Sequence, residues 1–267
     1  MSSPRYTHGH AESVLRSHRT RTAENSAAYL VPELRPGLSL LDVGSGPGTI
    51  TADLAALVAP GRVTALETSE AVLELTRGEI TSRGCTTVDF DVGDVLALRF
   101  PADSFDIVHA HQVLQHIADP VAALREMVRV CRPGGLVAAR DGDYGGFIWH
   151  PSSAGLDRWN ELYHAAARAN RGEPDAGRHL LAWAHAAGCN DVRASSSTWC
   201  YADPDSRAEW GDTWAERITN SAIAGQLISS GLATTDELRQ IAEAWRDWAA
   251  QPDGWLSLVH GEILIRV

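Results

Sequence analysis

The segment with the clearest chemical meaning is a glycine-rich turn that directly follows a short apolar run. Residues 40–48 read LLDVGSGPG. Glycine lets a ligand lie against the backbone, because no side chain fills the space. If the apolar run is a strand, the turn lies where open α/β sheets bind ligands, and Asp42 favours a ligand with a cationic group over a diphosphate.

Two more carboxylates follow at the ends of the next two apolar runs. Glu67 comes about 20 residues after the turn, where a carboxylate can accept both hydroxyl protons of a ribose. Asp94, in the sequence Gly93-Asp94-Val95, is placed to accept a hydrogen bond from the exocyclic amine of an adenine. Each acid alone could be a helix cap or a solvated charge. Together with Asp42 they predict a pocket for an adenosine that carries a cationic tail.

The elements that must position these residues alternate between short apolar runs and helical patterns. The apolar runs predict strands at 38–43, 62–66, 87–92, 105–110 and 136–141. Helical patterns separate them at 49–58, 71–82 and 121–131. Strands that alternate with helices in this way form a parallel sheet with right-handed crossovers. Outside this core we expect helices at 11–18, 23–30 and 178–187, a strand near 192–201, a mostly helical stretch at 205–250 and a strand at 255–267.

These motifs resemble the class I S-adenosylmethionine-dependent methyltransferases, specifically the ubiquinone/menaquinone-biosynthesis-like small-molecule group (methyltransferase type 11). The resemblance covers about residues 36–141 and, more weakly, 178–192. It rests on DVGSGPG at 42–48, Glu67, GDV at 93–95, FDIV at 105–108, VLQHIADP at 113–120 and RPGG at 132–135. It implies an α/β fold with a Rossmann-like, doubly wound, mostly parallel seven-stranded sheet, an N-terminal helical lid and helical C-terminal insertions.

The resemblance also implies S-adenosylmethionine as the cofactor. The glycine turn would approach the methionine part, Glu67 would hold the ribose, and Asp94 with the Val95 amide would bind the adenine. Backbone groups at 110–112 would border the amino-acid moiety, and Arg21 in the lid segment 18–25 would bind its carboxylate. The full set of expected cofactor-binding residues is Arg21, Asp42, Gly44, Ser45, Gly46, Gly48, Glu67, Thr68, Gly93, Asp94, Val95, Ala110, His111 and Gln112.

Two residues near the expected methyl group are candidates for catalysis. By resemblance to family members that methylate hydroxyls, His116 would be a general base and Asp141 would assist it. Each has a structural alternative, His116 as a hydrogen-bonding group at a helix end or in the core, and Asp141 as a cap of the next turn. His109 is expected to pack in the core. Further residues that could line the pocket are His111, His150, Tyr6 and Tyr144.

Other functions are disfavoured by particular residues. A nicotinamide-dependent oxidoreductase would use G-x-G-x-x-G or A, but Thr49 stands in the third place and Asp42 would repel the diphosphate. Enzymes that methylate nucleobases commonly carry Asn/Asp-Pro-Pro-aromatic after the fourth strand, where this chain has HQVL at 111–114. The net charge of −11 also argues against a nucleic-acid partner. A protein that binds the cofactor but no longer transfers methyl stays open.

The amino-acid composition excludes some catalytic mechanisms, and the distribution of tryptophan distinguishes two parts of the chain. All 23 basic residues are Arg, which excludes a Schiff-base lysine and a phosphate-binding Walker lysine. All nine tryptophans lie between Trp149 and the C-terminus. We therefore expect a lid at 1–35, a cofactor-binding core at 36–142, and at 143–267 the completion of the sheet with a Trp-rich acceptor-binding cap. Most of the rings should pack together, while Trp149, Trp159 or Trp199 could face a small, apolar or aromatic methyl acceptor.

The remaining features concern location and assembly. No apolar run is long enough to cross a bilayer, and the N-terminal residues contain no apolar stretch typical of a secretory signal. The four cysteines form no C-x-x-C pair, and no metal site is expected. These features predict a cytoplasmic protein with free thiols and with no membrane or nucleic-acid partner, and they leave a homodimer open.

Overall fold

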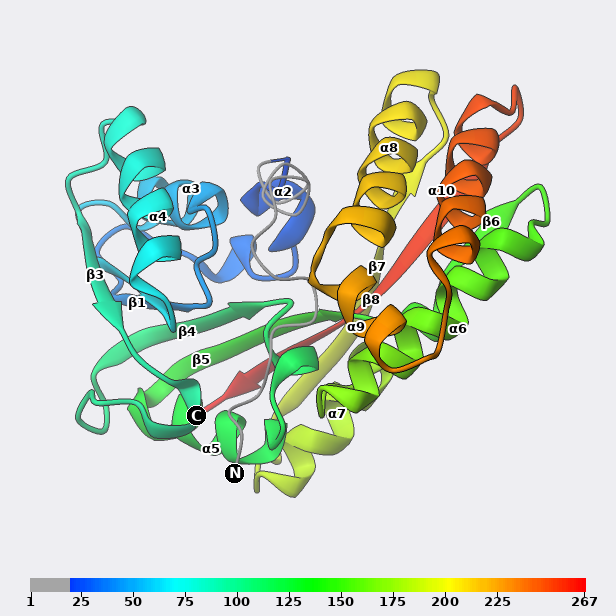
Figure 1. Cartoon of the computed structure of the whole chain (residues 1–267). Coiled ribbons are helices and arrows are strands. Elements are labelled where there is room, and N and C mark those ends of the chain that lie inside the picture. Colours follow the sequence, from blue (N-terminus) through cyan, green and yellow to red (C-terminus); the bar gives the residue numbers. More distant parts are fainter. Residues whose placement is uncertain (1–19) are drawn as a thin grey trace.

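The computed structural model describes residues 20–267, and its centre is a twisted eight-stranded sheet (Figure 1). Seven strands follow one another across the sheet in the order β3 (Val88–Val92), β2 (Val63–Glu67), β1 (Leu40–Val43), β4 (Phe105–His111), β5 (Cys131–Gly142), β8 (Trp255–Arg266) and β7 (Val192–Tyr201). Strands β1 to β5 are parallel, and β8 is antiparallel to both β5 and β7. The predicted seven-stranded, mostly parallel sheet is confirmed. The short β6 (Ile148–His150), which pairs with the first residues of β8, was not predicted.

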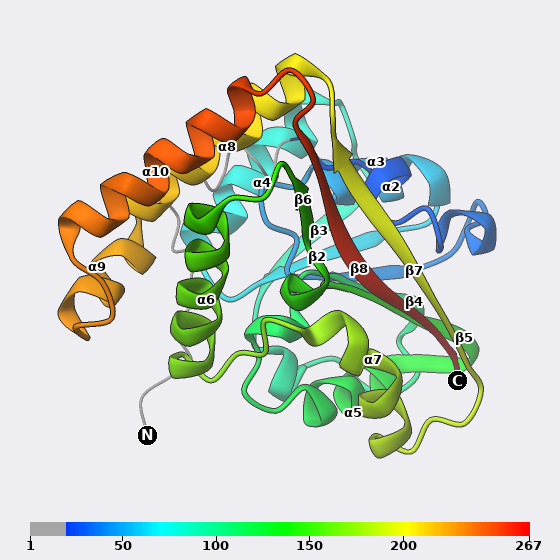
Figure 2. The ribbon, with the colours of Figure 1, turned by 90° about the vertical axis from the view of Figure 1, so that its right-hand side faces the viewer.

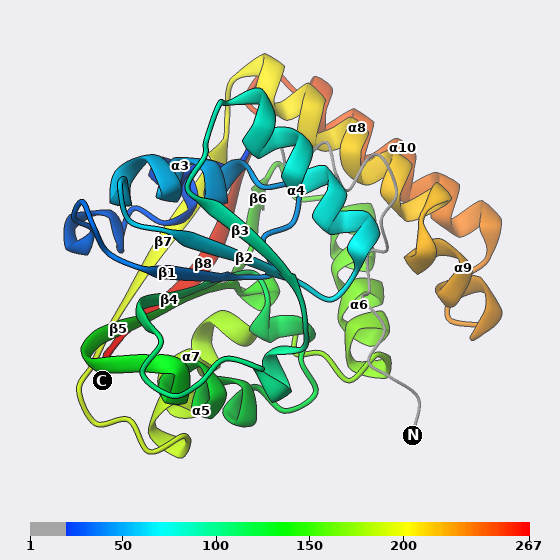
Figure 3. The same cartoon turned by 90° about the vertical axis from the view of Figure 1, so that its left-hand side faces the viewer.

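Helices cover both faces of the parallel part of this sheet (Figure 3). On one face lie α2 (Ala23–Ser26), α3 (Thr49–Val58) and α4 (Glu70–Ser82), and on the other lie α5 (Pro120–Val130) and α7 (Ala176–Ala186). Successive strand residues point to opposite faces, so Leu40 of β1 packs with α3 and α4 while Leu41 packs with α5 and α7. Both leucines are fully buried, which explains why the strands read as continuous apolar runs.

The C-terminal part of the chain forms a helical cap beside the sheet (Figure 2). It contains α6 (Ala154–Ala169), α8 (Pro204–Asn220), α9 (Ala222–Ser229) and α10 (Thr235–Ala250). These helices share a third hydrophobic core, centred on three fully buried tryptophans. The ring of Trp159 meets Trp214 edge-on at 4.5 Å between centroids and Trp245 at 4.9 Å. Edge-to-face contacts of this kind stabilise a core beyond the apolar area that they bury.

Most predicted boundaries agree with the structure to within two residues. Helix α3 and strand β7 have the predicted bounds, whereas the helix expected at 23–30 is only α2 followed by the single 3-10 turn η1 (Val31–Glu33). The helix expected at 11–18 lies outside the described residues, as does most of the lid. All four cysteines are free. Within residues 20–267, no helix combines the length and apolar character that a membrane span requires.

Candidate active site

A cavity of about 610 Å³ opens at the carboxyl ends of the parallel strands, next to the cap. Its wall includes the glycine turn after β1 and reaches the rings of the cap. We call one side the turn side, which is lined by Asp42, Gly44, Gly46, Glu67 and Asp94. We call the other side the cap side, which is lined by Tyr144, Phe147, Trp199, Trp210 and Arg217.

The glycine turn needs glycine for reasons that differ from one position to the next. Gly44 and Gly46 have φ of +72° and +56°, a region that other residues rarely adopt. A Cβ on Gly44 would lie 2.5 Å from Cγ2 of Val113, whereas a Cβ on Gly46 would meet no atom within 4 Å. Gly48 does not line the cavity; it precedes α3 with φ +92°, and its Cβ would press on the backbone of Thr76. The surface of the turn at Gly46 is therefore open to a ligand.

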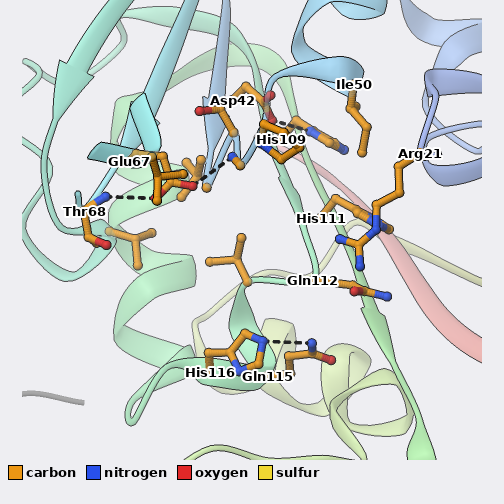
Figure 4. A pocket seen from close by; sticks show the side chains of 18 of the residues that line it. Arg21, Asp42, Ile50, Glu67, Thr68, His109, His111, Gln112, Gln115 and His116 are labelled. Carbon is orange, nitrogen blue, oxygen red and sulfur yellow. Dashed lines mark hydrogen bonds and ion pairs between the residues drawn. The ribbon is translucent and has the colours of Figure 1, made fainter. Parts of the chain in front are cut away.

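Two carboxylates are fixed by backbone N–H groups on the turn side. Oε1 of Glu67 accepts from Gly46 N at 2.8 Å, and Oε2 accepts from Thr68 N at 3.1 Å (Figure 4). Burial and, more weakly, Asp42 raise the pKa of Glu67, although these N–H groups oppose the shift. Asp94 follows β3 and accepts from Leu96 N at 2.9 Å, which starts the 3-10 turn η2 (Val95–Ala97). The strands and turns therefore place both acids at the cavity without help from the cap.

Asp42 is held more tightly than the sequence suggests. It is the register partner of His109 on the neighbouring strand, so both side chains leave the sheet on the same face. His109 Nδ1 donates to Oδ1 of Asp42 at 2.8 Å, and Thr51 Oγ1 donates to Oδ2 at 2.6 Å. His109 is fully buried, as expected for a core residue, but it also lines the cavity. Internal donors therefore hold both oxygens of Asp42 in place, and its negative charge lies at the cavity wall.

Arg21 and His111 lie across the cavity from Glu67 and Thr68 (Figure 4). The Arg21 guanidinium lies 5.4 Å from the ring centre of Trp199. His111 is 7% exposed, and neither of its ring nitrogens has a hydrogen-bond partner among the described residues. Burial, and after it Arg21, lowers the pKa of His111 well below its usual value, so the ring is neutral at pH 7. The cavity wall here is a neutral imidazole beside a permanent positive charge.

Gln112 adopts a backbone conformation that is unusual for a residue other than glycine. Its φ is +53°, and its N–H donates to the Arg140 carbonyl at 2.7 Å. Its side-chain amide donates to Nε2 of His260 at 2.9 Å, while Nδ1 of His260 donates to the Leu258 carbonyl. A left-handed conformation of this kind costs on the order of 1–3 kcal/mol and clusters at functional sites. Here it turns the chain so that the Gln112 side chain lines the cavity.

The orientation of His116 is set by a neighbour that the sequence did not single out. Gly142 N donates to Oε1 of Gln115 at 3.3 Å, and a backbone N–H can only donate, so the amide nitrogen of Gln115 faces the other way. That nitrogen lies 3.0 Å from Nε2 of His116 and must donate to it (Figure 4). The neutral ring then carries its hydrogen on Nδ1. Burial, and after it Arg21, lowers the pKa of His116 to about 3.

Asp141 lies beneath the cavity and is not one of the lining residues. It is fully buried near the end of β5, and its Oδ1 accepts from Gln115 N at 3.1 Å. Its Oδ2 has no hydrogen-bond partner among the described residues. Burial raises the pKa of Asp141 to about 7. Asp141 is thus connected through Gln115 to the loop that carries His116.

Most of the predicted site residues meet at this one cavity. Those that line it are Arg21, Asp42, Gly44, Ser45, Gly46, Glu67, Thr68, Gly93, Asp94, Val95, His111, Gln112 and His116. Gly48, Ala110 and Asp141 do not line it. Of the other candidates Tyr144 lines it, His150 is an exposed residue near Asp253, and Tyr6 lies outside the described residues.

The tryptophans divide between packing and the cavity. Of the three rings singled out from the sequence, only Trp199 lines the cavity; Trp159 is in the cap core and Trp149 packs against it. The cavity is also lined by Gln115, Trp210 and Arg217, which were not predicted as site residues. Trp210 shares both the helical spacing and the hydrophobic core of Trp214, so spacing alone could not show that it also lines the cavity. No signal in the sequence marked Gln115 or Arg217.

Comparison with known proteins agrees with this geometry. Residues 41–139 match the model of a family described as a methyltransferase domain. The chain is 33% identical over 272 residues to an uncharacterized methyltransferase of Schizosaccharomyces pombe, across 98% of this chain and 96% of that protein. It is 29% identical over 279 residues to a probable methyltransferase, ltbC, of Aspergillus luteorubrus, across 97% and 96% of the two chains. The YcgJ protein of Bacillus subtilis shares the fold, with a TM-score of 0.59, 19% identity and coverage of 90% and 97%.

Proposed function

The chain belongs to the class I S-adenosylmethionine-dependent methyltransferases, and on that premise we propose that its methyl acceptor is a small, flat, apolar or aromatic molecule bound on the cap side of the cavity. The observation that carries this proposal is the continuity of the cavity, which joins an acidic glycine turn to a wall of aromatic rings. Two ligands that bind next to each other in one cavity can react directly. Membership of this family excludes the alternative function considered for the glycine turn, a nicotinamide-dependent oxidoreductase.

The turn side fits the adenosyl and methionyl groups of the cofactor. Gly46 offers open backbone, and the carboxylates of Glu67 and Asp94 face the same space. We infer that Glu67 holds the ribose hydroxyls, that Asp94 binds the adenine amine, and that Arg21 pairs with the methionine carboxylate. The charge of Asp42 favours the cationic end of the ligand. When bound, the cofactor supplies the electrophilic methyl group of its sulfonium.

The contribution of the protein to the reaction is mainly placement and exclusion of water. Holding two reacting groups in line and in contact supplies roughly 7–11 kcal/mol towards the barrier. The rings of Tyr144, Phe147, Trp199 and Trp210 form an apolar wall around the space left for the acceptor, and this wall keeps out water as a competing nucleophile.

The state of His116 limits how a proton can be removed from the acceptor. The Nε2 of His116 already accepts a hydrogen bond from Gln115, so this nitrogen is not placed to take a proton from the acceptor. A group whose pKa is about 3 is also a weak base at pH 7. We therefore favour His116 as a structural hydrogen-bonding group, whose Nε2 accepts from Gln115, in place of the general base that the family resemblance implied.

The proposal is tested by incubating the full chain with S-adenosylmethionine labelled in its methyl group and a panel of flat aromatic acceptors. Mass spectrometry would follow S-adenosylhomocysteine and the methylated product. We expect the two to form in equal amounts with at least one acceptor, and Glu67→Ala to form both more slowly when the cofactor is not saturating. Cofactor that binds tightly but yields no methylated product from any member of the panel would instead favour a protein that binds the cofactor without transferring methyl.

A further inference from the structure

Three histidines of the sheet line the cavity, and they differ in how their ring nitrogens are used. His260 uses both nitrogens, since Nδ1 donates to the Leu258 carbonyl and Nε2 accepts from Gln112. His109 uses one nitrogen, which donates to Asp42. Neither nitrogen of His111 has a hydrogen-bond partner among the described residues. Of these three rings, His111 therefore keeps the most hydrogen-bonding capacity for a ligand.

The ring of His111 is surrounded by groups that are themselves held in place. His111 is the last residue of β4 and is 7% exposed. Its ring centre lies 5.8 Å from that of Trp199 and 6.3 Å from that of His260. The indole N–H of Trp199 is already used, because it donates to the Asn25 carbonyl at 2.7 Å. A buried polar atom without a partner costs free energy, so a ligand that pairs with His111 gains what the surrounding side chains do not supply.

The sheet register places His111 beside the glycine turn. Val43 at the end of β1 is the partner of Ala110 on β4, so Gly44 and His111 follow at the same level of the two neighbouring strands. The Trp199 ring next to His111 belongs to the cap side of the cavity. His111 thus lies where the turn side and the cap side meet, and Figure 4 shows it across the cavity from Glu67.

The chemistry of the ring decides which ligand group suits it. A neutral imidazole has one N–H that donates and one lone pair that accepts, and a hydroxyl group can pair with either nitrogen. A carboxylate only accepts, so it can use the N–H alone. The pKa of His111 is lowered first by burial and then by Arg21 and Arg140, and charges that disfavour a proton on the ring also disfavour an ammonium group beside it. A hydroxyl group is therefore the best match.

We propose that the methyl acceptor is a phenol, a flat aromatic molecule that lies along Tyr144, Trp199 and Trp210 and whose hydroxyl group forms a hydrogen bond with His111. This inference rests on the proposed function, since it names the class of molecule that enters the acceptor space. His111 is then a specificity-determining residue, because an aromatic molecule without the hydroxyl would leave its buried ring nitrogens unpaired.

The test compares 2-naphthol with 2-fluoronaphthalene, which has nearly the same shape but carries no hydroxyl group. Equilibrium dialysis at pH 7, where a phenol is neutral, measures the binding of each probe to the full chain saturated with S-adenosylhomocysteine. We expect 2-naphthol to bind at least about fivefold more tightly, the effect of one hydrogen bond in a buried site. His111→Phe keeps a flat ring without nitrogens and should reduce this ratio to near one. His111→Asn keeps a donor and an acceptor and should retain part of it.

A matched control makes the same substitution at a histidine outside the cavity. His150 is exposed and does not line the cavity, so His150→Phe should keep the full preference for 2-naphthol. Equal binding of the two probes by the native chain would mean that water alone satisfies His111 and would overturn the proposal. Binding of neither probe, or a preference that survives His111→Phe, would overturn it as well.

Binding of S-adenosylhomocysteine is measured first for every variant, and it separates this inference from the proposed function. If the native chain does not bind S-adenosylhomocysteine, the proposed function itself fails. If His111→Phe is folded, as shown by its unfolding transition, but has lost this binding, His111 serves the cofactor and the inference fails alone. If His111→Phe does not fold, His111→Leu replaces it as the variant without ring nitrogens.

Discussion

The turn side of the cavity is acidic and made largely of backbone, whereas the cap side is basic and made of rings. On the turn side, Glu67 accepts hydrogen bonds from the backbone N–H groups of Gly46 and Thr68. Both donors lie within a few residues of the strands that end at the cavity. On the cap side, Trp199 comes from β7 and Arg217 from α8, and they meet only because β7 and the cap fold back over the sheet. The turn side is therefore suited to a cofactor that all members of a family share. The cap side can come to bind a different acceptor when a few of its side chains are exchanged.

The largest expected effect concerns the hydrophobic core of the cap. Trp159 is fully buried against Trp214 and Trp245, so Trp159→Ala should lower the free energy of unfolding by about 3–5 kcal/mol. The matched control is Trp255→Ala, which removes a ring that is 39% exposed and should cost about 1 kcal/mol or less. Chemical denaturation measures both. Similar losses for the two variants would show that the cap is not held by this aromatic core.

A second effect comes from Asp141, the buried acid near the end of β5. The pKa of Asp141 is raised to about 7 in the folded protein, so between about pH 4 and pH 7 the unfolded chain loses this proton while the folded chain keeps it. The contribution of Asp141 to stability therefore falls as pH rises through this range. We expect Asp141→Asn to remove the slope and, above pH 7, to unfold with a free energy on the order of 2–4 kcal/mol higher than the native chain.

Denaturation curves collected between pH 4 and pH 8 on both proteins give the difference directly. Other carboxylates with lowered pKa values, such as Asp106 and Glu126, contribute a slope of opposite sign, but they are common to both proteins and cancel. A difference that stays constant with pH would mean that Asp141 ionises normally in the folded state.

The third prediction tests the turn side alone. Glu67→Ala removes the carboxylate proposed to hold the ribose hydroxyls, and we expect S-adenosylhomocysteine to bind about 100-fold more weakly, the effect of losing two hydrogen bonds to a charged group. Asp89→Ala is the control, because Asp89 is an exposed carboxylate on β3 that pairs with Arg62 away from the cavity. Calorimetric titration measures both variants. Equal affinity of Glu67→Ala and the native chain would remove Glu67 from the cofactor site.

The smallest effect is expected at His116. Because its ring is neutral above a pKa of about 3, His116 should contribute no ionisation between pH 5 and pH 9. We expect His116→Asn to lower kcat by less than about tenfold and to keep the shape of the pH–rate profile, measured with an acceptor that the labelled-methyl assay identifies. A limb near pH 6–7 that disappears in the variant would restore His116 as the general base.

Features that depend on residues close together in the chain could be predicted from the sequence, whereas features that depend on distant residues could not. Helix α3 and the glycine turn depend on neighbours in the chain, and the sequence predicts both, down to the bounds of α3. Trp159 and Trp199 could not be separated, because one ring fills a core and the other lines a cavity only after distant elements pack. The sequence also could not show that Gln115 contacts both Asp141 and His116, because Asp141 comes from a distant strand. Residues that meet only through long-range packing have no characteristic spacing in the sequence.

The measurement that tests the central claim most directly is a crystal structure of the full chain with S-adenosylhomocysteine bound. The account predicts ribose hydroxyls on Glu67, the adenine amine on Asp94, and the sulfur facing the space between Trp199 and Arg217, which stays free for the acceptor. An adenosine seated among the rings of the cap, with Glu67 and Asp94 away from the ligand, would contradict the division of the cavity into its two sides.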